Sequence, residues 1–135
     1  MIKKIVFCLA VLTLTGCASL TIDKIVDFNP TDDICIINNP SVKKAFVDAY
    51  KVSIEKLGYE VSIKQSDENA CRITSTYTAS YGMHWGVYLA RADLKIFRNN
   101  KLIGRAQYKA PRAALSKHGR VSGKIDKLVK GLFLK

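Results

Sequence analysis

Three successive stretches between residues 71 and 109 alternate apolar and polar side chains, and this alternation constrains the fold more than any other feature of the chain. They are residues 71–81 ("CRITSTYTASY"), 85–97 ("WGVYLARADLKIF") and 102–109 ("LIGRAQYK"). Because successive side chains of a strand point to opposite faces of a sheet, a period of two indicates strands with one buried face. The sequence therefore predicts three strands that each turn one face to a hydrophobic core.

The turn between the second and third of these strands can be tested for register. A two-residue loop, Asn99-Asn100, would place Leu94 opposite Arg105 and mix the core and solvent faces, because a slip of one residue flips a whole strand. A three-residue loop at residues 98–100 keeps the faces consistent, with Asn100 in the left-handed region that asparagine tolerates. In this register Asp93 lies opposite Arg105 on the polar face.

Two helices and two short strands complete the expected fold. Residues 34–39 and 59–64 are β-prone, Asn39-Pro40 and Gly58 are typical of the two ends of a helix, and residues 122–133 carry an apolar helical stripe. The order is β-α-β-β-β-β-α. We predict an α/β fold: a two-layer sandwich of a mixed sheet of about five strands with two helices on one face.

The first residues of the chain have the pattern of an export signal. Lys3 and Lys4 precede an apolar run at residues 5–14, which is followed by small residues. The run is too short for a helix that spans a bilayer, since such a helix needs about 20 apolar residues.

The end of that run, Leu14-Thr15-Gly16-Cys17, resembles the lipobox of bacterial lipoproteins. The resemblance implies cleavage before Cys17, a diacylglyceryl group on its thiol and an acyl chain on its new amine. Ala18 follows where lipoproteins of the inner membrane usually carry Asp, so the resemblance implies the outer membrane. The alternative is an ordinary signal peptide with a chance cysteine. We expect residues 1–16 to be a lipoprotein signal peptide and 17–33 a lipidated N-terminus and tether. Residues 34–135 should form a single periplasmic α/β domain. An edge strand within residues 20–28 is left open.

Four further segments, "ICIINNP", "TYTASY", "ADLKIFRNNKLIGRAQY" and the final "KI..LV..LF", look like a small, uncharacterised family of Gram-negative lipoproteins. That family has no assigned activity, so the resemblance implies no catalytic residues. More loosely, the layout is similar to small envelope lipoproteins that serve as accessory subunits of transport or assembly machines.

Two cysteines remain in the exported chain after Cys8 is removed and Cys17 is lipidated. Cys35 and Cys71 would then lie in an oxidising compartment, where we expect them to form a disulfide, with two buried free thiols as the alternative. His84 and His118 lack the spacing of zinc ligands, and we expect neither a metal nor a cofactor.

Positive charge is concentrated in the last third of the sequence. Residues 95–135 contain twelve Lys and Arg but a single acid, Asp126. Nucleic acid is not an expected partner of an exported protein, so an anionic lipid, lipopolysaccharide or an acidic protein face remains. The candidate anion-binding residues are Lys109, Arg112, Lys117 and Arg120. The alternative is a solvated face that keeps the domain soluble.

No catalytic motif accompanies these features. Trp85, Val87 and Leu89 share the phase of the polar face and form a candidate partner face, unless residues 20–28 fold over them. The sequence therefore favours a non-enzymatic envelope lipoprotein that acts as an interaction or accessory domain, with the bilayer and an envelope protein as partners. The alternative is a binding module for an anionic envelope component through the basic third.

Overall fold

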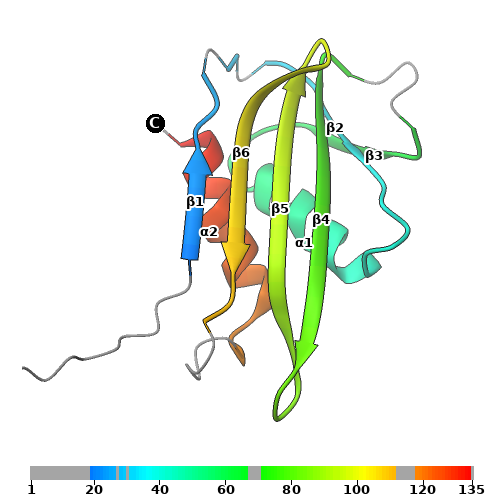
Figure 1. The fold of residues 1–135 in the computed structure, drawn as a ribbon. Helices are drawn as coiled ribbons and strands as arrows, with labels where there is room; N and C mark the ends of the chain where they lie inside the picture. The colour runs from blue at the N-terminus through cyan, green and yellow to red at the C-terminus, as the bar shows by residue number, and fades with distance from the viewer. Residues whose placement is uncertain (1–18, 27, 30, 67–70, 112–117, 135) are drawn as a thin grey trace, which may run out of the picture.

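The structure, a computed structural model, describes residues 19–26, 28–29, 31–66, 71–111 and 118–134. One mixed sheet of six strands, in the order β1-β6-β5-β4-β2-β3, has two helices packed on one face (Figure 1). The strands are β1 (Ser19–Asp23), β2 (Ile34–Ile37), β3 (Val61–Lys64), β4 (Ile73–Met83), β5 (Val87–Arg98) and β6 (Lys101–Lys109), and the helices are α1 (Lys44–Glu55) and α2 (Val121–Phe133). Neither helix is long and apolar enough to span a membrane among the described residues.

This architecture confirms the predicted α/β class, the mixed sheet and the two helices. The number of strands was too low by one, because Ser19–Asp23, assigned to the tether, forms β1 and pairs antiparallel with β6. Ile22 and Ile25 pack on the core beside the helices. These residues therefore do not cover the opposite face of the sheet, which was the alternative left open.

Helix α1 begins at Lys44, later than the start expected after Asn39, and Asn39 instead closes a turn that precedes the helix. The side-chain oxygen of Asn39 accepts the backbone N–H of Ser41 at 3.0 Å, and its side-chain amide donates to the carbonyl of Tyr77 at 3.1 Å. The backbone N–H of Val42 also donates to the carbonyl of Asn39 at 3.1 Å, which closes a turn over residues 39–42. Asn39 thus ties the loop after β2 to β4, and the helix starts at Lys44.

The hydrophobic core lies between the sheet and the helices. Helix α1 contributes Phe46, Tyr50 and Ile54, which are four residues apart and lie on one side of the helix. Helix α2 contributes an equivalent stripe that includes Leu128 and Leu132. The sheet supplies the inward phase of its central strands, in particular Ile34, Ile36, Ile73, Tyr77, Leu94, Ile96 and Ala106.

The loop between β5 and β6 has two residues, so the predicted three-residue loop was wrong. Arg98 pairs with Lys101, and Asn99 and Asn100 both have positive φ, at 48° and 63°. This conformation is that of a type I′ hairpin turn. A β-bulge between Ile96 and Phe97 inserts one extra residue on β6 and restores the faces. Leu94 therefore lies opposite Ala106 in the core, as the alternation requires.

A second bulge, between Ser80 and Tyr81 of β4, changes the phase of β5. Ser80 pairs with Arg91, whereas Tyr81 pairs with Leu89, so one residue of β5 is left over. The bulge turns Leu89 into the core, where it is fully buried. The prediction that Leu89 shares an exposed face with Trp85 and Val87 is therefore wrong.

Candidate functional site: the outer face of the sheet

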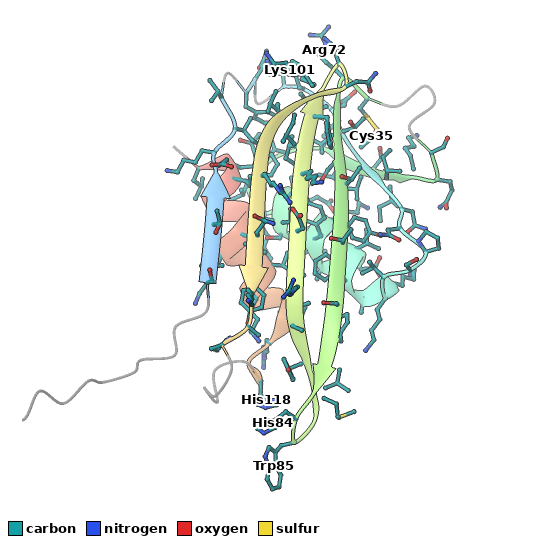
Figure 2. The ribbon with its side chains drawn as sticks, in the orientation of Figure 1. Cys35, Arg72, His84, Trp85, Lys101 and His118 are labelled. Atoms are coloured by element: carbon teal, nitrogen blue, oxygen red, sulfur yellow. A yellow bond between two sulfur atoms is a disulfide. The ribbon has the colours of Figure 1, made fainter. Side chains whose placement is uncertain are left out.

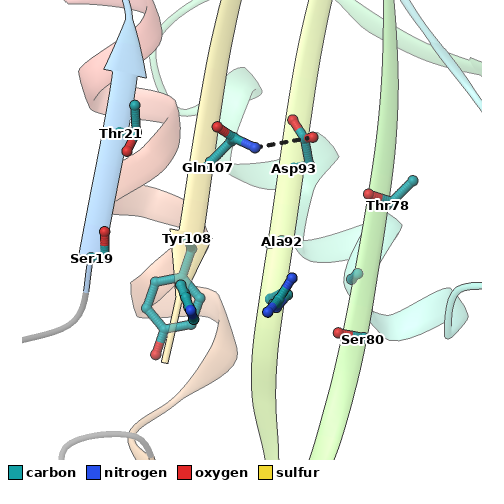
Figure 3. Close-up of a pocket in the computed structure, with 11 residues that line it drawn as sticks. Ser19, Thr21, Thr78, Ser80, Ala92, Asp93, Gln107 and Tyr108 are labelled. Atoms are coloured by element: carbon teal, nitrogen blue, oxygen red, sulfur yellow. Dashed lines mark hydrogen bonds between the residues drawn. The ribbon is translucent and has the colours of Figure 1, made fainter. Parts of the chain in front are cut away.

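The face of the sheet opposite the helices (Figure 1) is here called the outer face, and polar side chains lie along it on four strands. The registers of β1, β6, β5 and β4 align its side chains in three rows. The rows are Ser19–Lys109–Arg91–Ser80, Thr21–Gln107–Asp93–Thr78 and Asp23–Arg105–Lys95–Thr76. A shallow depression of about 460 Å³ lies over the first two rows (Figure 3).

The centre of the outer face is held by an ion pair. Arg105 donates from Nε and Nη2 to the two carboxylate oxygens of Asp93, at 3.0 and 2.6 Å. The amide of Gln107 donates to Asp93 at 3.5 Å (Figure 3). The hydrogen bond and the negative charge of Asp93 raise the pKa of the Arg105 guanidinium. The predicted register, with Asp93 directly opposite Arg105, is wrong: Lys95 lies opposite Arg105 and Gln107 lies opposite Asp93, so the contact between Asp93 and Arg105 is diagonal.

The first row places two cations side by side. Arg91 lies directly opposite Lys109, both side chains are exposed, and neither has an ion-pair partner among the described residues. Like charges in opposite positions destabilise a sheet. Serine hydroxyls flank them at both ends of the row. This arrangement suits an anionic or hydroxyl-bearing partner, and it offers no nucleophile with an adjacent base within the described chain.

The expected anion-binding residues fall in two groups. Lys109 ends β6 and Arg120 directly precedes α2, and both are exposed. Arg112 and Lys117, like the lipidation residue Cys17, lie outside the described residues. Arg91 was missed as a partner of Lys109, since only the strand register brings the two together. Nor does the described part of the chain gather three His, Cys, Asp or Glu side chains that could hold a metal ion.

The turn between β4 and β5 displays an apolar tip. Met83, Trp85 and Val87 are 74%, 94% and 55% exposed, and Trp85 lies at the extreme end of the hairpin (Figure 2). Trp85 has a φ of 59°, in the left-handed region that few residues other than glycine adopt. The ring of His84 stacks on that of His118, with centroids 6.2 Å apart. Two members of the predicted partner face, Trp85 and Val87, are therefore exposed here and Leu89 is not.

Cys35 and Cys71 form the expected disulfide, with their Cα atoms 5.4 Å apart. The backbone N–H of Cys71 also donates to Sγ of Cys35 at 3.1 Å. Cys35 lies at the opposite end of the sheet from Trp85 (Figure 2). The bond therefore lies beside β2, where Cys35 pairs with Thr74, and it is remote from the hairpin tip.

The sequence matches no family model and no curated protein. The fold is similar to that of PelC from Paraburkholderia phytofirmans, crystallised as a dodecamer in two crystal forms. In space group P6 the TM-score is 0.60 at 9% identity, and the match covers 84% of this chain and 92% of that one. A single-residue variant in space group C2 has a TM-score of 0.59 at 10% identity, with 84% and 93% covered. At this identity the comparison shows a shared fold alone.

Proposed function

We propose that this protein is a lipid-anchored envelope lipoprotein that faces the periplasm from the outer membrane and acts through non-enzymatic interactions. The anchor rests on the signal pattern that ends in Leu14-Thr15-Gly16-Cys17. Strand β1 begins at Ser19, only two residues after Cys17, so the folded domain would lie directly at the bilayer. Each buried methylene of an acyl chain adds about 0.8 kcal/mol, and two chains already give stable anchoring.

The outer face of the sheet is the observation that carries the interaction role. Four strands present their polar side chains in aligned rows, and both helices of the described chain lie on the other face. A broad, ordered surface with few deep features suits another macromolecule better than a small substrate. The PelC dodecamers are consistent with this proposal, because they are assemblies of subunits with the same fold. Copies of this chain are therefore candidate partners beside other envelope proteins.

A second candidate function is the binding of an anionic envelope component. The observation that favours it is the adjacent positive charge of Arg91 and Lys109, which have no ion-pair partner within the part of the chain that the structure describes. A phosphate-bearing partner placed over both side chains would relieve their repulsion.

Site-specific photo-crosslinking in the cell envelope tests both candidates. A photoreactive residue at Thr78 or Gln107, on the outer face, should crosslink to protein, and high salt during irradiation should not lower the yield. A photoreactive residue at Val52, exposed on α1, should give no protein adducts. Adducts at multiples of the chain mass identify self-assembly, and other masses identify an envelope protein. Adducts to lipid alone would favour the anion-binding module, and an absence of adducts at both outer positions would contradict the interaction role. In parallel, Cys17→Ser should abolish fatty-acid labelling; a labelled variant would contradict the anchor.

A further inference from the structure

We infer that the end of the molecule formed by the β4–β5 hairpin tip and the start of β1 docks on an anionic phospholipid bilayer, with Trp85 in the membrane interface. The inference rests on the proposed lipid anchor at Cys17. It adds a second, structured contact with the membrane and therefore a fixed orientation of the domain.

The hairpin tip displays its apolar side chains at a conformational cost. A bulky residue at positive φ is a true backbone outlier, and strain of this kind persists where it serves a role. Here it supports a tryptophan that is 94% exposed, flanked by the exposed side chains of Met83 and Val87. Tryptophan is enriched at membrane interfaces, because its ring is apolar and its N–H is polar. A solvent-exposed turn with no partner would be better served by Asn or Gly at this position.

The tip is held in place by ring contacts. His84 stacks on His118 at 6.2 Å with an angle of 21° between the rings, and Tyr88 meets His118 edge-on at 5.6 Å. His118 belongs to the segment that enters α2 (Figure 2). The hairpin and the helix are thus joined at this end, and the tip projects beyond both.

The end of the molecule formed by the hairpin tip and the start of β1 carries exposed positive charge. Arg91, Lys109 and Arg120 are exposed and have no ion-pair partners among the described residues. The sequence around the start of β1, the β4–β5 hairpin and the connection from β6 to α2 contains no Asp or Glu; these stretches are residues 17–22, 74–92 and 107–125. At the opposite end, marked by Arg72 and Lys101 in Figure 2, Arg72 and Arg98 share the carboxylate of Asp32, each at 3.8 Å. The two ends therefore differ in that exposed cations of the first end have no acidic neighbour of this kind among the described residues.

The lipid anchor and the hairpin tip can reach the same bilayer. Ser19 lies in one row with Lys109 and Arg91, and Trp85, in the turn before β5, precedes Arg91 by six residues. The tip therefore extends roughly 20 Å past that row, whereas the two residues back to Cys17 span at most about 7 Å. Both reach one surface if the strands are inclined to the membrane normal, with the diagonal from the start of β1 to the hairpin against the lipid (Figure 1).

The fluorescence of Trp85 tests the inference directly, because it is the single tryptophan of the chain. The full lipidated protein is reconstituted into vesicles of phosphatidylcholine with about one third phosphatidylglycerol. Docking predicts blue-shifted emission, protection from acrylamide and strong quenching by brominated lipids. Flotation of the vesicles reports the lipid anchor independently.

A matched pair of variants separates the proposed surface from general charge. Arg91→Gln with Lys109→Gln should lower the ratio of docked to undocked protein by roughly tenfold or more, since two cations near an anionic surface are lost. Arg72→Gln with Lys101→Gln removes the same two residue types at the opposite end and should leave Trp85 quenching unchanged. Thermal unfolding of both variants shows that each is folded.

Each of the following outcomes supports or overturns the docking of this end on the bilayer. Protein that floats with the vesicles and has lipid-quenched Trp85, sensitive only to the first variant, supports the docking. Protein that floats but keeps Trp85 fully accessible to acrylamide overturns the docking and leaves the anchor intact. Equal loss of quenching in both variants also overturns the assignment of this end. Protein that neither floats nor shows quenching overturns the anchor and the docking together.

Discussion

Two buried tyrosines, Tyr50 and Tyr108, show how differently the same side chain can be accommodated in one core. The hydroxyl of Tyr50 is 2.6 Å from the hydroxyl of Ser75, and both residues are fully buried. The hydroxyl of Tyr108 is also buried but has no hydrogen-bond partner among the described residues. Burial raises the pKa of both phenols, and the effect is larger for Tyr50.

We expect the two phenylalanine variants to differ in stability. Tyr50→Phe leaves Ser75 without its main partner and should lower the free energy of unfolding by about 1–3 kcal/mol. Tyr108→Phe removes a hydroxyl that accepts or donates no hydrogen bond within the described chain, and this change should be neutral or slightly stabilising. Urea denaturation at pH 7 measures both, and equal losses would contradict the assigned contacts.

The dependence of the free energy of unfolding on alkaline pH also tests the burial of Tyr50. Tyrosine in the unfolded chain ionises near pH 10, whereas buried Tyr50 keeps its proton to higher pH. Its contribution to stability is therefore complete below pH 10 and is lost above it, at up to about 1.4 kcal/mol per pH unit. Tyr50→Phe should show a shallower loss between pH 10 and 11, and an unchanged slope would indicate that Tyr50 is accessible.

At the scale of elements, β1 is fixed by the way it meets α2. A Cβ atom on Gly131 of α2 would meet the side chain of Ile22, so the absence of a side chain there is what lets the strand approach the helix. Gly104 of β6 leaves similar room for Ile25, whose Cγ1 would lie 2.5 Å from an added Cβ. The backbone N–H of Ile25 also donates to the carbonyl of Leu132 at 3.2 Å.

This contact predicts a reversal of sign in a double-mutant cycle. Gly131→Ala alone should destabilise the protein, because the new methyl group displaces Ile22. In an Ile22→Ala background the same change should stabilise it by about 0.5–1 kcal/mol, through the higher helix propensity of alanine. Gly123→Ala, in the same helix with open space around it, is the control and should act equally in both backgrounds. Equal effects of Gly131→Ala in the two backgrounds would show that the contact is absent.

The elements also show what the sequence could and could not predict. Alternation identified the phase of β4 and of most of β5 and β6, because a buried face requires it. Alternation did not predict either bulge. One extra residue in a strand changes the face to which a side chain such as Leu89 or Ile103 points, without altering the composition of the strand. The Asn99-Asn100 pair is a signal for a type I′ turn and could have identified the two-residue loop. The rows of the outer face depend on register between four strands, so Arg91 beside Lys109 could not be predicted from either strand alone.

For the whole molecule, the disulfide acts mainly on the unfolded chain. It joins residues 36 apart and encloses α1 and β3 within a closed loop. Closing a loop of this length removes conformational freedom from the unfolded state and stabilises the fold by roughly 3–4 kcal/mol on the chain-entropy model.

Replacing Cys35 and Cys71 together with serine should therefore lower the free energy of unfolding by about 2–5 kcal/mol. Wild-type protein unfolded under reducing conditions is the control, and its free energy of unfolding should fall by a similar amount. Both forms should keep the fluorescence of Trp85, which lies at the other end of the sheet. A reduced protein as stable as the oxidised one would contradict the prediction.

The position of β1 also decides how the domain bears mechanical force. Five residues of β1 pair with β6, and the strand begins two residues after Cys17. A pull on acyl chains held at Cys17 would run along the axis of β1 and slide it against its neighbour. Sliding loads all the hydrogen bonds of the pair at once, whereas peeling would break them one at a time. With a lipidated Cys17, β1 would be the mechanical link through which drag on the domain is transferred to the membrane.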